Sequence, residues 1–249
     1  MSSPDLVLRF DSVSKQYVRR NVRPFLVAGK WGQGREANGD EAFWAVDAID
    51  LQIPASQSVA ILGENGSGKS TLLSLATGSI LPTRGVVSVR GRLAPLLALG
   101  VGFQPDMTAP ENAFASASLL GLDRDQGSSR LRPILDFADL GGFENAPLRT
   151  YSAGMVARLA FAVVMHVDAD LLLIDEVLSV GDGAFQRKCL RRIEELQQAG
   201  TSILLASHDL DAVRRACTRA IWLRSGRIEV DAPVEECVAR YRSYLDELS

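Results

Sequence analysis

A glycine-rich loop at residues 63–70 limits the folds open to this chain more than any other segment. Its sequence, GENGSGKS, fits the pattern GxxxxGK[ST], follows the short apolar run Ser58–Leu62 and precedes a helical pattern that continues to about Thr77. Glycines let successive backbone N–H groups turn inward around an anion, and the N-terminus of the next helix adds partial positive charge. The pattern therefore predicts a phosphate-binding loop, and a glycine turn without a ligand is the weaker alternative.

A second apolar run, Leu171–Ile174, ends in the adjacent carboxylates Asp175 and Glu176. Ligands of open α/β sheets bind at the carboxyl ends of strands, so both acids are expected to point toward the loop. We expect Ser70 and Asp175 to hold Mg²⁺ and Glu176 to polarise an attacking water. An acid pair that only caps a helix is the alternative, and it becomes minor beside a phosphate loop.

The two histidines receive different interpretations. His208 directly follows a third apolar strand, Ile203–Ala206, next to the strand that carries the carboxylates, so we expect it to sense the γ-phosphate. His166 falls near the end of an apolar helix and is interpreted as structural.

Composition narrows the class of protein. The chain has 249 residues, of which 47% are hydrophobic, and its net charge of −3 disfavours a general nucleic-acid binder. The first residues are polar and acidic, unlike a signal peptide, and no apolar run approaches the ~20 residues that cross a bilayer. Cys189, Cys217 and Cys237 lack metal-ligand spacing, so we expect reduced thiols.

The remaining pattern is that of an α/β domain with a helical insertion. We expect parallel strands at Leu171–Ile174 and Ser202–Ala206, and a helix from about Asp182 to Gly200. Residues 110–165 are expected to be mostly helical, with breaks at Gly121, Pro133, Gly141-Gly142 and Pro147. The other expected elements are strands at Leu6–Phe10, Gly85–Val89 and Leu93–Leu99, a hairpin around Ser225-Gly226 and a last helix after Pro233.

One segment has an unusual charge. Between Lys15 and Arg35 there are six positive side chains and no negative one, interleaved with Phe25, Leu26 and Trp31. A solvated loop and a segment that lies against anionic lipid headgroups both explain this composition, and the sequence does not choose between them.

Together with Tyr151-Ser152-Ala153-Gly154-Met155, these residues resemble the ATPase subunit of an ABC transporter. The five residues stand where that family has its signature sequence, usually written LSGGQ. Ser152 and Gly154 match it, whereas Tyr151, Ala153 and Met155 depart from it. The resemblance implies a P-loop NTPase of ABC type, with a mainly parallel sheet, an antiparallel β part and a helical subdomain at about 105–158. It also implies a head-to-tail homodimer, in which each signature helix contacts the γ-phosphate of an ATP held by the other subunit.

The resemblance assigns further roles. Gln104 links Mg²⁺ and water to the membrane partner, residues 179–182 face the other subunit, and His208 is the switch histidine. Tyr17 stacks on adenine, with Trp44 as the competing candidate. Glu176, His208 and Lys69 are the expected catalytic residues, and Ser70, Gln104 and Asp175 the expected Mg²⁺ ligands. The expected ATP-binding residues are Gly63, Glu64, Asn65, Gly66, Ser67, Gly68, Lys69, Ser70, Thr71, Tyr17, Gln104, Ser152 and Gly154.

The departures are similar to those of one subfamily, the ATPases that export bacterial O-antigen, teichoic acid, galactan or capsule. The sequences around Ala157–Ala162 and Ile174–Asp182 and the basic insertion at about 18–43 carry this resemblance. It implies a motor on the cytoplasmic face of the inner membrane that drives two copies of a polytopic permease and acts on a lipid-linked glycan only indirectly. We expect one domain over residues 1–249, without the C-terminal carbohydrate-binding domain of some members.

Other functions account for fewer residues. An importer ATPase leaves the basic insertion unexplained. A soluble ABC ATPase acting on DNA or ribosomes usually carries coiled-coil insertions or two ATPase units, and this sequence shows neither. A GTPase usually has an NKxD motif, which is absent, and a small-molecule kinase leaves Tyr151–Met155 and His208 unexplained.

Overall fold

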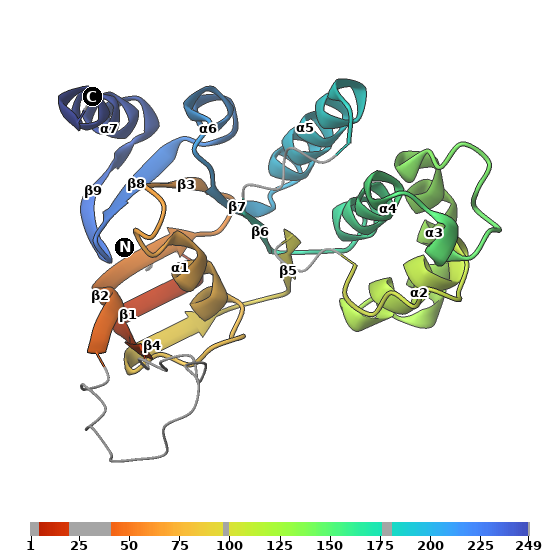
Figure 1. Ribbon diagram of the computed structural model, residues 1–249, viewed down its shortest axis with the longest axis horizontal. Helices are drawn as coiled ribbons and strands as arrows, with labels where there is room; N and C mark the ends of the chain where they lie inside the picture. Colours follow the sequence, from red (N-terminus) through yellow and green to blue (C-terminus); the bar gives the residue numbers. More distant parts are fainter. Residues whose placement is uncertain (1–4, 20–40, 97–99, 176–180, 249) are drawn as a thin grey trace, which may run out of the picture.

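The computed structural model describes residues 5–19, 41–96, 100–175 and 181–248. Within these ranges the strands form two sheets, one antiparallel in the order β2-β1-β4 and one in the order β5-β6-β7-β3-β8-β9 (Figure 1). Strands β5, β6, β7, β3 and β8 are parallel, and β9 is antiparallel to β8. The strands are β1 (Leu6–Arg19), β2 (Glu41–Pro54), β3 (Ser58–Leu62), β4 (Arg84–Val89), β5 (Leu93–Pro95), β6 (Leu171–Asp175), β7 (Ser202–Ala206), β8 (Arg219–Arg224) and β9 (Arg227–Pro233).

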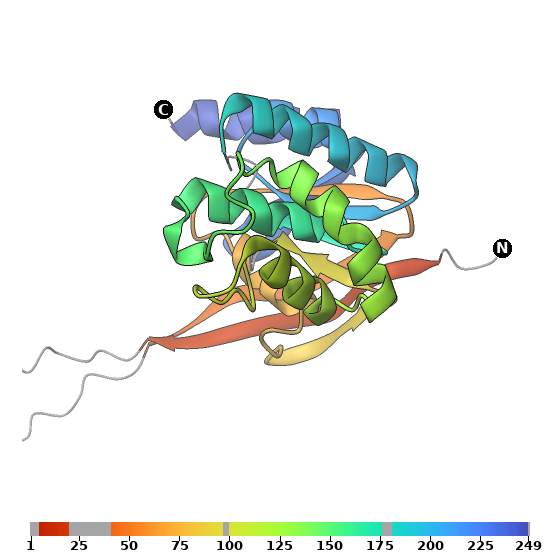
Figure 2. The ribbon, with the colours of Figure 1, turned by 90° about the vertical axis from the view of Figure 1, so that its right-hand side faces the viewer.

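The helices occupy both sides of the parallel sheet. Helix α1 lies beside the antiparallel sheet, while α2, α3 and α4 gather at the opposite end of the molecule from α7 (Figures 1 and 2). The helices are α1 (Lys69–Ala76), α2 (Ala109–Leu119), α3 (Arg124–Ala138), α4 (Ala153–Met165), α5 (Gly183–Gln198), α6 (Leu210–Ala216) and α7 (Val234–Leu248), with a short 3-10 turn, η2 (Leu148–Thr150). No helix in the described ranges is long and apolar enough to cross a membrane.

Strand β3 shows why the core has two layers. All of its residues are buried, but alternate side chains point to opposite faces of the sheet. Val59 and Ile61 join a core that contains Leu72 and Leu73 of α1 and the apolar side chains of the antiparallel sheet. Ala60 and Leu62 join a second core built with α4, α5 and α7. The loop that follows β3 is therefore anchored from both layers.

Most expected elements are confirmed. The strand at 58–62, the parallel pair β6 and β7, the helix that follows Asp182 and the hairpin around Ser225-Gly226 all occur as expected. The fold class is confirmed, with a parallel core, an antiparallel sheet and helices α2 and α3 in the expected helical segment. Helix α4 begins within 105–158 and runs on to Met165. The three cysteines are free and buried, and burial raises the pKa of each.

Three expectations about boundaries are wrong. The first strand continues past Phe10 to Arg19. The sequence pattern did not show this continuation, because bulges interrupt the alternation of the side chains and Ser12 adopts a positive φ of 47°. Strand β5 ends at Pro95 rather than Leu99, and residues 97–99 lie outside the described ranges. Pro133 does not break its helix. It lies inside α3, where burial of the following residues against the core outweighs the lost backbone hydrogen bond.

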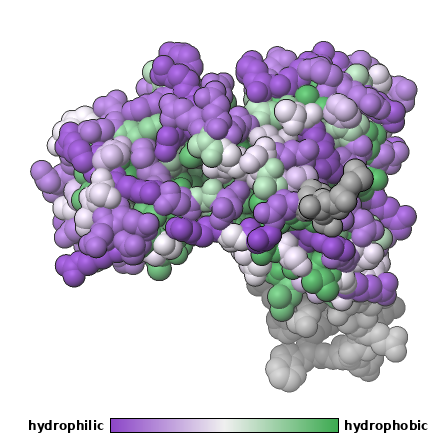
Figure 3. All heavy atoms as spheres, turned by 180° about the vertical axis from the view of Figure 1, so that it is seen from behind, coloured by the Kyte–Doolittle hydropathy of each residue, from purple (hydrophilic) through white to green (hydrophobic). Residues whose placement is uncertain are grey.

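The face of the molecule shown in Figure 3 is mainly hydrophilic, with apolar side chains in several places. Seen from behind, hydrophobic atoms gather over the antiparallel sheet (Figure 3). Leu81, Val86 and Val89 are the large apolar residues that are exposed at and before strand β4. Such a patch falls on the edge strand of the sheet, away from the parallel core.

Candidate nucleotide site

The P-loop, residues 63–70, is packed so closely that two of its glycines are required. Gly63 and Gly68 have φ values of 151° and 109°, which side chains disfavour. A Cβ on Gly63 would lie 2.4 Å from the carbonyl oxygen of Leu223, and one on Gly68 would lie 2.5 Å from that of Ala45. Strands β2 and β8 thus fix the shape of the loop from both sides.

Lys69 occupies the centre of the P-loop. Its side chain is buried, and its Nζ donates hydrogen bonds to the carbonyl oxygens of Gly63 at 2.7 Å and Glu64 at 3.0 Å. Lys69 is also the first residue of α1, whose N-terminal N–H groups face the loop. An anion in the loop would meet an ammonium, backbone N–H groups and a helix dipole together.

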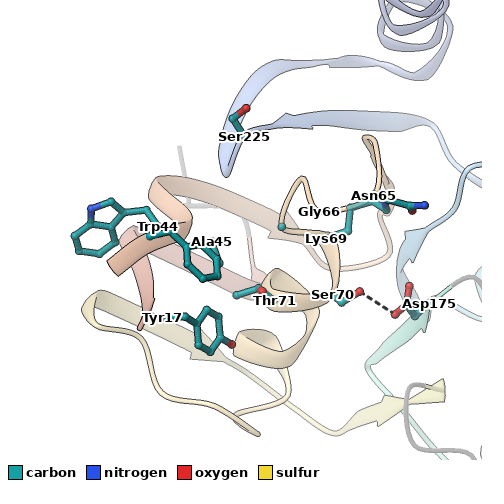
Figure 4. Close-up of a pocket in the computed structure, with 12 residues that line it drawn as sticks. Tyr17, Trp44, Ala45, Asn65, Gly66, Lys69, Ser70, Thr71, Asp175 and Ser225 are labelled. Carbon is teal, nitrogen blue, oxygen red and sulfur yellow. Dashed lines mark hydrogen bonds between the residues drawn. The ribbon is translucent and has the colours of Figure 1, made fainter. Parts of the chain in front are cut away.

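Ser70 and Asp175 come together from different elements. The Oγ of Ser70, on α1, donates to Oδ2 of Asp175, at the end of β6, at 3.5 Å (Figure 4). No group of three or more acidic, histidine or cysteine side chains that could hold a metal occurs in the described ranges. Two hard oxygen donors fit Mg²⁺, which usually takes one or two protein ligands and completes its shell with phosphate oxygens and water.

A cavity of about 420 Å³ extends from these residues to the antiparallel sheet. Its walls come from β1, β2, the P-loop, α1, the end of β6 and the β8–β9 turn. The lining residues are Tyr17, Phe43, Trp44, Ala45, Asn65, Gly66, Gly68, Lys69, Ser70, Thr71, Asp175 and Ser225. Most of the described residues expected at a phosphate site are therefore brought together.

Strand pairing distinguishes the two candidate aromatic residues. Tyr17 of β1 lies directly opposite Phe43 of β2, and their ring centroids are 6.0 Å apart. Trp44 belongs to the next pair, so its side chain leaves the opposite face of the sheet, where Arg84 lies 4.9 Å from its ring. In Figure 4 the Tyr17 ring lies beside Thr71, whereas the Trp44 indole points away from Lys69. The geometry favours Tyr17 over Trp44 as the aromatic ring that faces the cavity. It adds Phe43 to this aromatic wall, a residue that sequence reasoning missed.

Gln104 does not line the cavity, but its backbone is held by a residue that sequence reasoning also missed. The side-chain amide of Asn112, on α2, is fully buried. Its Oδ1 accepts a hydrogen bond from the Gln104 N–H at 2.6 Å, and its Nδ2 donates to the Gln104 carbonyl at 3.1 Å. The signal was present in the sequence, since Asn112 is a lone amide among the small apolar residues Ala109, Ala113 and Ala117.

The signature residues lie apart from the cavity. Ser152 caps α4, its Oγ accepting a hydrogen bond from the Met155 N–H at 3.2 Å, and both Ser152 and Gly154 are exposed. Two of the residues that depart from the signature sequence, Tyr151 and Met155, make contacts within this chain. The Tyr151 hydroxyl donates to the Phe143 carbonyl at 2.6 Å, and Met155 packs partly against the core. Burial, with a smaller contribution from the charge of Glu144, raises the pKa of Tyr151.

Of the other residues singled out in the sequence, His208, Asp182 and His166 are described by the structure, and the rest lie outside the described ranges. Asp175 pairs with Ala206 across β6 and β7, so His208 follows the neighbouring strand at the same edge of the sheet, although it does not line the described cavity. Asp182 caps α5, and the bond from the Phe185 N–H chiefly holds its pKa below the usual value. His166 lies at the C-terminal end of α4, where burial lowers its pKa. Glu176, residues 177–180 and residues 20–40 of the basic insertion lie outside the described ranges.

Solved structures match the fold over nearly the whole chain. A structure described as the ATP-binding subunit of an ABC transporter has a TM-score of 0.74 and is 21% identical, covering 94% of this chain and 93% of its own. A dimeric ATP-binding cassette bound to ADP and inorganic phosphate has a TM-score of 0.71 and is 22% identical, covering 91% and 98%.

Sequence relatives match more closely. The O-antigen export system ATP-binding protein RfbB of Klebsiella pneumoniae is 42% identical, covering 95% of this chain and 97% of its own length. RfbB of Myxococcus xanthus is 40% identical and TagH of Bacillus cereus, a teichoic acids export ATP-binding protein, is 36% identical. Each covers 96% of this chain, which spans 56% of the first and 43% of the second. The ABC transporter family matches residues 46–179. This chain is therefore a member of the ABC transporter family of ATP-binding proteins.

Proposed function

We propose that this chain is the ATP-hydrolysing motor of an exporter that moves a lipid-linked polysaccharide across the cytoplasmic membrane. The observation that carries the proposal is the 42% identity to an O-antigen export ATP-binding protein over almost the full length of both chains. Relatives named for teichoic acid export agree with a polysaccharide cargo, and galactan and capsule are further members of the same cargo class.

The cavity supports a defined binding mode for ATP. The adenine lies against Tyr17 and Phe43, and the phosphates enter the P-loop. Lys69 exchanges its two carbonyl partners for β- and γ-phosphate oxygens. The bound nucleotide is thus held by one aromatic wall and one anion site, which come from different sheets.

The residues that act on the γ-phosphate are assigned to the P-loop and the start of α1, to the loop of Gln104, and to the positions at or after the ends of β6 and β7 in the sequence. Ser70, Gln104 and Asp175 hold Mg²⁺, which neutralises phosphate charge when it is bound. Glu176 accepts a proton from the attacking water, and His208 donates a hydrogen bond to the γ-phosphate. Lys69 stabilises the charge on the transferred group.

A second copy of the chain completes the site. Ser152 and Gly154 lie at the exposed N-terminus of α4, outside the cavity of their own chain. In a head-to-tail homodimer this helix end faces the γ-phosphate held by the partner. Two ATP molecules are then enclosed between the subunits, and hydrolysis reopens the dimer.

The permease contact is assigned to the surface around Gln104. Val101, Met107 and Leu119 are large apolar residues that are 52%, 42% and 66% exposed. Asn112 joins the Gln104 backbone to α2, which also carries Leu119, so movement at this surface reaches the nucleotide site. The chain in this proposal is peripheral, on the cytoplasmic face of the membrane, with two copies of a polytopic permease.

The test is purification of the full chain from native membranes, followed by mass spectrometry and ATPase assay. Co-elution of a polytopic permease that raises ATPase activity is the expected result. A ribosomal or DNA-repair partner without a membrane protein would refute the export assignment. Replacement Glu176→Gln is expected to stop turnover while ATP stays bound, and normal turnover would remove Glu176 from its role.

A further inference from the structure

Helix α7 is tied to the P-loop by a side-chain hydrogen bond. The hydroxyl of Tyr244 donates to Oε2 of Glu64 at 3.1 Å. Glu64 is the second residue of the P-loop, whereas Tyr244 lies beyond residues 46–179, which match the ABC transporter family. The contact therefore joins the phosphate site to a part of the chain with no role in the binding mode proposed above.

The Tyr244 ring is positioned by contacts that do not involve Glu64. Its centroid lies 4.9 Å from that of Trp222, and the Arg224 guanidinium lies 4.6 Å above the ring. Trp222 is buried in β8, and the ring of Tyr241, one turn earlier on α7, has its centroid 5.6 Å from that of Trp222. These ring contacts fix the position of the Tyr244 hydroxyl independently of its hydrogen bond to Glu64.

Glu64 has its backbone and its carboxylate in different surroundings. Its carbonyl oxygen accepts hydrogen bonds from Lys69 Nζ at 3.0 Å and from the Ser67 N–H at 3.1 Å, so the backbone belongs to the anion site. Its side chain is exposed and is not among the described residues that line the cavity. A ring of N–H groups with an ammonium attracts any nearby carboxylate, so an untethered Glu64 side chain would compete with phosphate.

We propose that Tyr244 is a positioning residue for ATP binding, because its hydroxyl holds the Glu64 carboxylate outside the phosphate site. The position of α7 then sets the affinity of the P-loop for ATP. The inference rests on ATP binding in this cavity and not on the transported cargo.

A double-mutant cycle tests the proposal in the full-length chain. Equilibrium binding of a non-hydrolysable ATP analogue with Mg²⁺, together with KM and kcat for ATP, is measured for the parent, Tyr244→Phe, Glu64→Gln and the double variant. Tyr244→Phe is expected to weaken binding and raise KM roughly three- to tenfold, with kcat unchanged. Glu64→Gln is expected to bind at least as tightly as the parent, and Tyr244→Phe to have no further effect in that background.

Ser243→Ala is the matched control, since it removes a hydroxyl one position away on α7 that bonds only to the Ala239 carbonyl among the described contacts. Unchanged binding in Tyr244→Phe would overturn the proposal, and so would an equal loss in both backgrounds, which would indicate ring packing instead. Failure of the parent to bind ATP would overturn the proposed function as well. Normal binding by the parent with no coupling overturns this inference alone.

Discussion

Two helix N-termini that carry glycine are built in opposite ways in this chain. At α1, a Cβ on Gly68 would lie 2.5 Å from the backbone oxygen of Ala45 and 3.0 Å from Val46. At α4, a Cβ on Gly154 would meet only the Oγ of Ser152 within 4 Å, at 3.8 Å. The first end is enclosed by neighbouring strands, and the second is open to solvent.

This difference indicates that glycine is present at the two helix ends for different reasons. Gly68 is required by the chain's own backbone, because both its φ of 109° and its neighbours exclude a side chain. Nothing within the described chain requires glycine at position 154, where the conformation is helical and there is room for a methyl group. A requirement there has to come from another molecule, which agrees with the proposed second subunit.

The largest expected effect comes from Gly68→Ala. The new methyl group forces the P-loop to move away from β2, and we expect ATP affinity to fall roughly 10- to 100-fold as the anion site distorts. The free energy of unfolding should fall by about 1–3 kcal/mol. Equilibrium nucleotide binding and denaturant unfolding measure the two effects. Parental affinity in this variant would show that the enclosure of α1 does not shape the site.

Gly154→Ala is the matched replacement at the open end. Alanine favours a helix over glycine, so the free energy of unfolding should stay constant or rise by up to about 1 kcal/mol. ATP binding by the dilute, monomeric chain should match the parent, while ATPase activity at saturating ATP should fall roughly tenfold or more if this helix end approaches the partner's phosphate. A loss of monomer affinity like that of Gly68→Ala would erase the contrast between the two ends.

The enclosed end is also the part that sequence could predict well. The run Ser58–Leu62, the P-loop and the start of α1 are local patterns, since an apolar strand, positive-φ glycines and a helix follow one another along the chain. The parallel strand that ends at Asp175 was equally visible as an apolar run between turn signals. The meeting of Ser70 with Asp175 followed from the rule that parallel strands end at a common edge.

The aromatic wall and the loop of Gln104 could not be predicted in the same way. Placing Phe43 beside Tyr17 requires the register of β1 and β2, which are joined by the basic insertion and shifted by bulges. The hydrogen bonds of the Asn112 side chain hold the loop from Gln104 to Thr108, whose path no local sequence pattern specifies. The aromatic wall and the loop of Gln104 both depend on contacts between distant or irregular segments, which the periodicity of the sequence does not predict.

Asn112→Ala extends the comparison to a third helix, α2. Here a buried side chain, and not the absence of one, holds the neighbouring loop in place. Removing the amide leaves the Gln104 N–H and carbonyl without these partners, and we expect the free energy of unfolding to fall by about 1–3 kcal/mol. Ser118→Ala, which removes an exposed hydroxyl bonded to the Phe114 carbonyl on the same helix, is the control. Denaturant unfolding measures both variants, and an equal small loss would mean that Asn112 does not hold this loop.

The smallest expected effect is that of Tyr151→Phe, beside the open end. This change removes the bond to the Phe143 carbonyl and keeps the edge-on ring contact with Phe143, so we expect a loss of about 0.5–1.5 kcal/mol. Burial raises the pKa of Tyr151, so its neutral hydroxyl contributes stability below the unfolded pKa of about 10 and loses that contribution as pH rises through the higher folded value. The difference between parent and variant in urea unfolding should therefore be constant at neutral pH and shrink above pH ~10. A difference that stays constant into the alkaline range would show that the ring alone, and not the hydroxyl, fastens this end of α4.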